Sequence, residues 1–73
     1  MENGDKIKVV KDNHSTGGMY IGLIGTVSIV DETYGDRFKY GISFNPEENE
    51  KCPFRDLLID RILYFDEDEI NKN

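Results

Sequence analysis

Cysteine, histidine and tryptophan are almost absent from this chain. It has one Cys, one His and no Trp among its 73 residues. A single cysteine cannot form an internal disulfide, and Cys52 with His14 falls short of the four N or S ligands of a structural zinc site. These two residues lie in different segments with no third group to orient them. We therefore interpret Cys52 as a small, partly buried apolar side chain rather than a catalytic thiol.

Long hydrophobic runs are absent too. No apolar stretch approaches the roughly 18 residues of a membrane-spanning helix, and no charged segment followed by an apolar run opens the sequence. With no membrane segment and no pair of cysteines, we expect a protein of the reducing cytoplasm.

Positive charge is scarce. Nine Lys and Arg face 15 Asp and Glu, which gives a net charge of −6. Most of the imbalance lies in residues 41–73, where four cationic side chains face nine carboxylates. Binding to phosphates depends on Lys and Arg that release counterions, so the composition disfavours nucleic acid as a partner and leaves only a local basic patch open.

The length predicts a single domain, residues 1–73, with a small core, because a chain of this size buries only roughly 60% of its unfolded surface. The apolar content of 37% and eight aromatic residues are enough for one barrel or small sandwich. The polar ends, about residues 1–4 and 71–73, are expected to fray.

Three segments of the first half read as strands. "KIKVVK" alternates, with Ile7 and Val9 on one face, and a long polar loop, "DNHSTGGMY", follows it. Leu23 to Asp31 forms the second expected strand, with Val27 and Ile29 facing inward. The third, "RFKYGISFN", puts four apolar residues on one face: Phe38, Tyr40, Ile42 and Phe44. A hairpin loop of about five residues with Gly35 in the left-handed conformation joins the last two strands.

The second half is more ambiguous. Residues 46–61 form a charged insertion. The stretch "PFRDLLIDRILYF", which begins inside it and ends at Phe65, fits either a short helix followed by a strand or one long strand. We favour a short helical piece over Phe54 to Asp60, begun by Pro53, and a strand over Ile62 to Phe65. "DEDEI" predicts a tight helical turn, after which Ile70 returns as a last short strand.

These elements predict an all-β fold: a small SH3-like barrel of about five short antiparallel strands with a short helical insertion before the fourth strand. The order "GDKIKVVK", polar loop, "GLIGTVSIVD", "FKYGISF" and "YFDEDEI" resembles small SH3-like β-barrels. Among these are KOW-type domains, the barrel of a photosystem I accessory subunit, and uncharacterised bacterial and phage proteins. The KOW resemblance implies nucleic-acid binding, but RNA-binding KOW domains are usually basic, whereas the loop "KDNHSTGGMYI" has a single Lys.

Two motifs that could suggest ligands have structural explanations. Gly22 and Gly25 precede a strand and no Lys follows them, so they do not form a phosphate-binding loop and are expected to serve a bend or a close strand approach. The run from Asp66 to Glu69 lacks the alternating carboxylates and central Gly of a calcium loop, and we interpret it as a solvated acidic turn with a capping carboxylate. We therefore expect no metal, no cofactor and no enzyme activity.

Aromatic, apolar and acidic side chains outside the expected core are the candidate protein contacts. The apolar insertion residues either cover the open end of the barrel or form a docking surface with a polar rim. The candidates are Tyr20, Tyr34, Phe54, Leu57, Leu58, Asp66, Glu67, Asp68 and Glu69.

The leading hypothesis is a non-enzymatic acidic module that binds and modulates a partner protein with a basic surface; a phage-encoded modulator of a host enzyme is one such case. One alternative is a KOW-type domain that binds nucleic acid through a basic stripe of Lys6, Lys8, Lys11, Arg37 and Lys39. The other is a structural accessory subunit of a larger complex. The sequence leaves the oligomeric state open.

Overall fold

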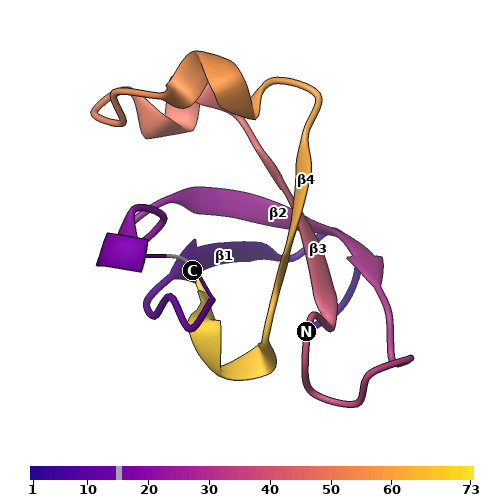
Figure 1. Ribbon diagram of the computed structural model, residues 1–73. Helices are drawn as coiled ribbons and strands as arrows, with labels where there is room; N and C mark the ends of the chain where they lie inside the picture. Colours follow the sequence, from indigo (N-terminus) through magenta and orange to yellow (C-terminus); the bar gives the residue numbers. More distant parts are fainter. Residues whose placement is uncertain (15) are drawn as a thin grey trace.

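A computed structural model describes residues 1–14 and 16–73 and contains one antiparallel sheet of five strands (Figure 1). The strands are β1 (Lys6–Val9), β2 (Ile24–Val30), β3 (Tyr40–Phe44), β4 (Ile62–Phe65) and β5 (Ile70–Lys72). Their order in the sheet is β4-β3-β2-β1-β5. The predicted all-β class is confirmed. β4 and β5 are the two edges of the sheet, so the sheet is not closed by hydrogen bonds.

All helical turns of the described residues are 3-10 turns. They are η1 (Thr16–Gly18), η2 (Pro46–Asn49), η3 (Arg55–Leu58) and η4 (Glu67–Glu69). Within the described ranges, no helix has the length and apolar character needed to cross a membrane.

β1 follows its predicted alternation. Ile7 and Val9 are fully buried, whereas Lys6 and Lys8 are exposed. β1 pairs with β2 on one side and with β5 on the other, where Ile7 lies opposite Lys72. The N–H of Asn73 also donates to the Lys6 carbonyl (2.9 Å), so residues 71–73, which we expected to fray, are paired with β1.

The β2 and β3 strands form the predicted hairpin, but the loop between them spans residues 31–39 instead of about five residues, because β3 begins only at Tyr40. A bulge also changes which residues face the core. Val27 lies opposite Ile42 and is buried, and the register then shifts so that Ile29 lies opposite Gly41. Ile29 therefore sits on the outer face, where a Cβ on Gly41 would come within 3.0 Å of the Ile29 Cβ. The prediction that Ile29 faces inward is wrong, because the bulge inserts one extra residue into the alternation.

The core lies on the inner face of the curved sheet. The rings of Phe44 and Phe65 meet edge to face at 6.0 Å, and the Tyr20 ring contacts Phe65 at the same distance. The buried hydrophobic residues are Ile7, Val9, Leu23, Val27, Tyr40, Ile42, Phe44, Leu58, Phe65 and Ile70. Tyr20 lies in the long loop before β2, so this loop contributes to the core.

The insertion between β3 and β4 consists of η2 and η3, where we predicted a short helix over Phe54 to Asp60. Buried Asn49 joins it to the sheet: its Oδ1 accepts the N–H of Ile24 (2.8 Å), and its side-chain amide donates to the carbonyls of Ile24 and Asn45 (both 2.9 Å). The predicted β4, η4 and β5 are confirmed. In Figure 1 the insertion and η4 lie at opposite ends of β4.

Candidate functional site

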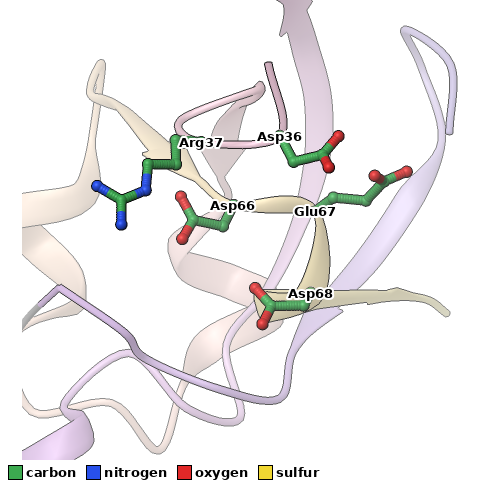
Figure 2. Close-up of a pocket in the computed structure, with 5 residues that line it drawn as sticks. All are labelled: Asp36, Arg37, Asp66, Glu67 and Asp68. Atoms are coloured by element: carbon green, nitrogen blue, oxygen red, sulfur yellow. The ribbon is translucent and has the colours of Figure 1, made fainter. Parts of the chain in front are cut away.

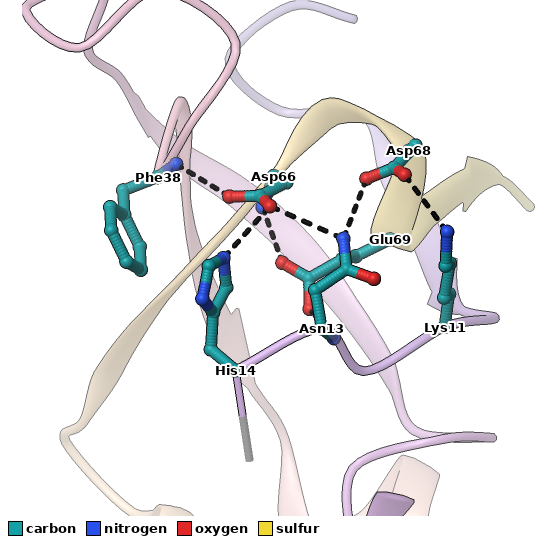
Figure 3. A network of polar contacts seen from close by, with 7 residues as sticks. All are labelled: Lys11, Asn13, His14, Phe38, Asp66, Asp68 and Glu69. Carbon is teal, nitrogen blue, oxygen red and sulfur yellow. Dashed lines mark hydrogen bonds and ion pairs between the residues drawn. The ribbon is translucent and has the colours of Figure 1, made fainter.

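Asp66, at the start of η4, is the centre of a polar network that joins three parts of the chain. Its Oδ1 accepts the N–H of Phe38 (2.9 Å), and its Oδ2 accepts the side-chain amide of Asn13 (3.2 Å) and lies 2.8 Å from His14 Nε2 (Figure 3). Burial raises the pKa of this carboxyl, but the hydrogen bonds from Phe38, His14 and Asn13 outweigh burial and hold the pKa below its usual value. Ionised Asp66 thus ties the loops before β2 and β3 to η4.

Glu69 is the second buried carboxylate of the network. Its Oε1 accepts the N–H of Asp66 (2.6 Å) and its Oε2 accepts the N–H of Asn13 (2.7 Å). Its backbone carbonyl accepts the N–H groups of Val10 (2.8 Å) and Lys11 (3.2 Å). Asp66 and Glu69 are therefore buried internal caps and are not available as the solvated protein contacts that we expected, because the long loop folds over them.

His14, Asp66 and Glu69 also bring three potential metal-ligand atoms within 4.8 Å of one another. Imidazole and carboxylate groups are ligands for zinc and similar ions. Here, however, the carboxylate oxygens already accept backbone N–H groups from Phe38, Asn13 and Asp66. A divalent ion would have to compete with these bonds, so we assign the cluster to the positioning of the two loops.

The network fixes Phe38 in an unusual backbone conformation. It has a left-handed backbone (φ 52°), lies outside β3 and is 39% exposed. The His14 ring covers one side of it, with ring centroids 4.5 Å apart (Figure 3). The alternation predicted Phe38 in the core. That prediction is wrong, because the hydrogen bond to Asp66 turns the chain before β3 begins.

Three exposed aromatic side chains surround a hollow beside this network. Tyr34 and Phe38 come from the loop before β3, Tyr64 comes from the outer face of β4, and Asp31 supplies a carboxylate. Tyr34 was a predicted contact, whereas Phe38, Tyr64 and Asp31 were missed. Tyr64 had a sequence signal: in the "ILYF" strand it alternates with buried Phe65 and so belongs to the outer face.

A second, acidic hollow is lined by Asp36, Arg37, Asp66, Glu67 and Asp68 (Figure 2). It lies next to the aromatic hollow, because Arg37 precedes Phe38 in the chain and Asp66 accepts the N–H of Phe38. The N–H of Glu67 donates to the Asp36 carbonyl (3.2 Å), which fixes the loop before β3 against η4. Figure 2 shows the carboxylates of Asp36 and Glu67 close together, with the Arg37 side chain extending away from them. This end of the molecule thus combines exposed negative charge with exposed aromatic surface.

The side chains of the predicted basic stripe are mostly paired with carboxylates. Lys6 pairs with Glu48, Lys11 with Asp68 (3.2 Å) and Lys39 with Glu67 (3.9 Å). Among the described residues, Lys8 and Arg37 have no ion-pair partner within 4.0 Å. Paired cations have little positive potential left for a phosphate backbone.

The remaining candidate contacts separate into two groups. Leu58 is buried and Phe54 is half-buried, so these two insertion residues cover the core as the first of our two interpretations expected. Tyr20, which we expected to be an exposed contact, is also half-buried and meets Phe54 edge to face at 5.9 Å. Leu57 is 63% exposed but belongs to the insertion, at the opposite end of β4 from η4 (Figure 1). Only Tyr34, Glu67 and Asp68 among the nine candidates lie exposed around the two hollows.

Comparison with known proteins gives no match for this chain, either to a protein-family model, to a curated protein or to a solved structure. The case for a function therefore rests on the geometry and charge described above.

Proposed function

We propose that this chain is a small SH3-like barrel that binds a partner protein through a basic surface on that partner and catalyses no reaction. The strand order supports the fold, because the first four strands pair in sequence and β5 returns beside β1 after a single 3-10 turn. Phe65 of β4 and Ile70 of β5 belong to the same buried core, as expected if the two edge strands approach each other in a barrel.

One observation carries the binding role: the aromatic hollow and the acidic hollow adjoin at one end of the molecule. Tyrosine and phenylalanine supply contact area with little entropy to lose, and the neighbouring carboxylates favour a cationic partner. The loops at this end are also held from inside by hydrogen bonds to Asp66 and Glu69. A surface fixed before binding spends less of its interaction free energy on ordering.

The rival role in nucleic-acid binding has less support. It needs free Lys and Arg along one face, and three of the five expected cations are in ion pairs. The acidic end would in addition repel a phosphate backbone.

Anisotropy titrations with a labelled oligolysine peptide and with a labelled RNA of equal length separate the two roles. We expect the peptide to bind and its affinity to fall as salt rises from about 50 to about 200 mM, because screening shortens the range of the charges. RNA binding that is lost on Lys8→Ala would support the rival instead. Absence of peptide binding at low salt contradicts our proposal, and co-purification at fixed stoichiometry would then indicate an accessory subunit.

A pair of double variants locates the surface. Asp36→Asn with Glu67→Gln removes two charges from the acidic hollow, and Glu50→Gln with Asp56→Asn removes two from the insertion. Both change the net charge equally, so the long-range attraction falls equally. We expect the first pair to weaken peptide binding several-fold more than the second. Equal losses would show that the peptide binds elsewhere or without a defined site.

A further inference from the structure

The aromatic hollow has the composition of a site for a cation. Tyr34, Phe38 and Tyr64 are 68%, 39% and 41% exposed, and Asp31 completes the lining. Within the described residues these three rings make no ring contact with one another, and together with Asp31 they line an open hollow. The face of an aromatic ring attracts cations, and most strongly where several rings surround one cation.

Hydrogen bonds within the chain fix the backbone around the hollow, and one of its rings packs against His14. Phe38 keeps its left-handed backbone because its N–H bonds to Asp66 and its ring lies against His14. The loop that carries Tyr34 is closed by the bond from the Asp31 N–H to the Lys39 carbonyl (2.7 Å) and by that from the Arg37 N–H to the Tyr34 carbonyl (3.3 Å). A non-glycine residue in this backbone region is strained, and such residues cluster at binding sites.

Asp31 supplies the negative charge of the hollow, and one of its carboxylate oxygens can accept a hydrogen bond from a ligand. Its Oδ1 accepts both the N–H (2.9 Å) and the hydroxyl (2.6 Å) of Thr33, which lowers the pKa of the carboxyl. Its Oδ2 accepts no hydrogen bond from the described residues. A neutral apolar guest would strip water from this charge without replacing it, and an anion would be repelled.

We propose that the hollow formed by Asp31, Tyr34, Phe38 and Tyr64 binds the alkylammonium head of a lysine side chain, free or methylated, on the partner. The inference rests on the proposed function and adds the chemical group that is recognised. An ammonium fits better than a guanidinium, because a guanidinium is best held by two oxygens of one carboxylate and Thr33 already occupies Oδ1.

Ring-resolved NMR titrations test the proposal. The ligands are Nα-acetyl-lysine amide, its trimethylated form, and the neutral analogue in which carbon replaces the quaternary nitrogen. We expect both the free and the trimethylated form to shift the ring signals of Tyr34, Phe38 and Tyr64. The neutral analogue should bind about 2- to 30-fold more weakly than the trimethylated form, the range set by a cation–π free energy of about 0.5–2 kcal/mol.

Variants outside the core locate the binding. Tyr34→Ala removes an exposed ring, and Asp31→Asn removes the charge while its amide oxygen can still accept from Thr33. Both should weaken binding of the cation several-fold, whereas Leu57→Ala, an exposed apolar change in the insertion, should leave it unchanged. Equal binding of the neutral analogue, or signal changes at other residues only, would overturn the proposal.

The experiments distinguish a failure of the lysine-binding hollow from a failure of the proposed function. If only the hollow is assigned wrongly, oligolysine still binds with its salt dependence and Tyr34→Ala does not change its affinity. If only the proposed function is wrong, oligolysine does not bind, while the small ammonium ligands still shift the three rings.

Discussion

Phe38 combines the features that the sequence predicts least well. Phe38, Tyr40 and Ile42 alternate in the sequence as residues of one strand face would, but β3 begins only at Tyr40. The group that turns Phe38 outward is Asp66, 28 residues later in the chain. A local pattern contains no information on such a partner, so the aromatic hollow could be predicted only in part, through Tyr34.

The hydrogen bonds of Asp66 should make the stability of the protein depend on pH. Asp66→Asn should lower the free energy of unfolding at neutral pH by about 1–3 kcal/mol, because the amide cannot replace a carboxylate that accepts three hydrogen bonds. The folded-state pKa of Asp66 lies below its unfolded value. The stabilisation is therefore fully present above the unfolded pKa of about 3.9 and is lost as the pH falls through the folded pKa.

Urea unfolding from about pH 7 to about pH 2 measures this effect. The difference between the wild type and Asp66→Asn should shrink toward zero at the acid end. Asp56→Asn, an exposed carboxylate change in η3, is the matched control and should follow the wild type at every pH. A difference that stays constant down to the lowest pH would show that Asp66 acts through shape rather than charge.

At the scale of elements, strands with one buried face were predictable and irregular segments were not. In β1 and β4 buried and more exposed residues alternate as the sequence predicts, and η4 forms at the acidic run that predicted a helical turn. The bulge that turns Ile29 outward has no local signal, because "TVSIV" alternates equally well in either register. The insertion shows too few residues with helical periodicity to distinguish a 3-10 turn from a helix.

A substitution at Gly25 tests whether the close approach of β2 and β3 requires glycine at this position. Its backbone is not left-handed, so its role is space: an added Cβ would lie 2.8 Å from the Ser43 carbonyl oxygen and 3.0 Å from Phe44 Cδ1. We expect Gly25→Val to reduce the free energy of unfolding by more than about 1 kcal/mol, since overpacking costs about 1–3 kcal/mol. Thr26→Val, next in the strand and half-buried, is the control and should change it by less than about 0.5 kcal/mol. An unchanged melting temperature for Gly25→Val would show that the strands can separate at little cost.

On the scale of the whole molecule, the nine carboxylates of residues 41–73 do not form one patch. Four are the three carboxylates of η4 and Asp66, which precedes η4 as its N-cap, and the other five lie in the insertion at the opposite end of β4 (Figure 1). The sequence could show that the second half is acidic, but not this separation. In the part of the chain that the structure describes, only the group at residues 66–69 lies next to exposed aromatic rings, which is why we place the binding surface there.

The same division predicts how stability is distributed through the molecule. Val27 and Ile42 are fully buried in neighbouring strands that are each paired on both sides, whereas Leu57 and Ile59 are exposed in the insertion. The insertion can therefore open while the sheet stays intact, and its amides should exchange with solvent at least about 10-fold faster than those of Val27 and Ile42. Amide exchange followed by NMR at neutral pH measures both classes in one experiment. The hydrogen bonds from Asn49 to β2 hold the insertion against the sheet, so Asn49→Ala should increase the difference in exchange rate between insertion and sheet. Equal exchange rates in the wild type would mean that insertion and sheet unfold together.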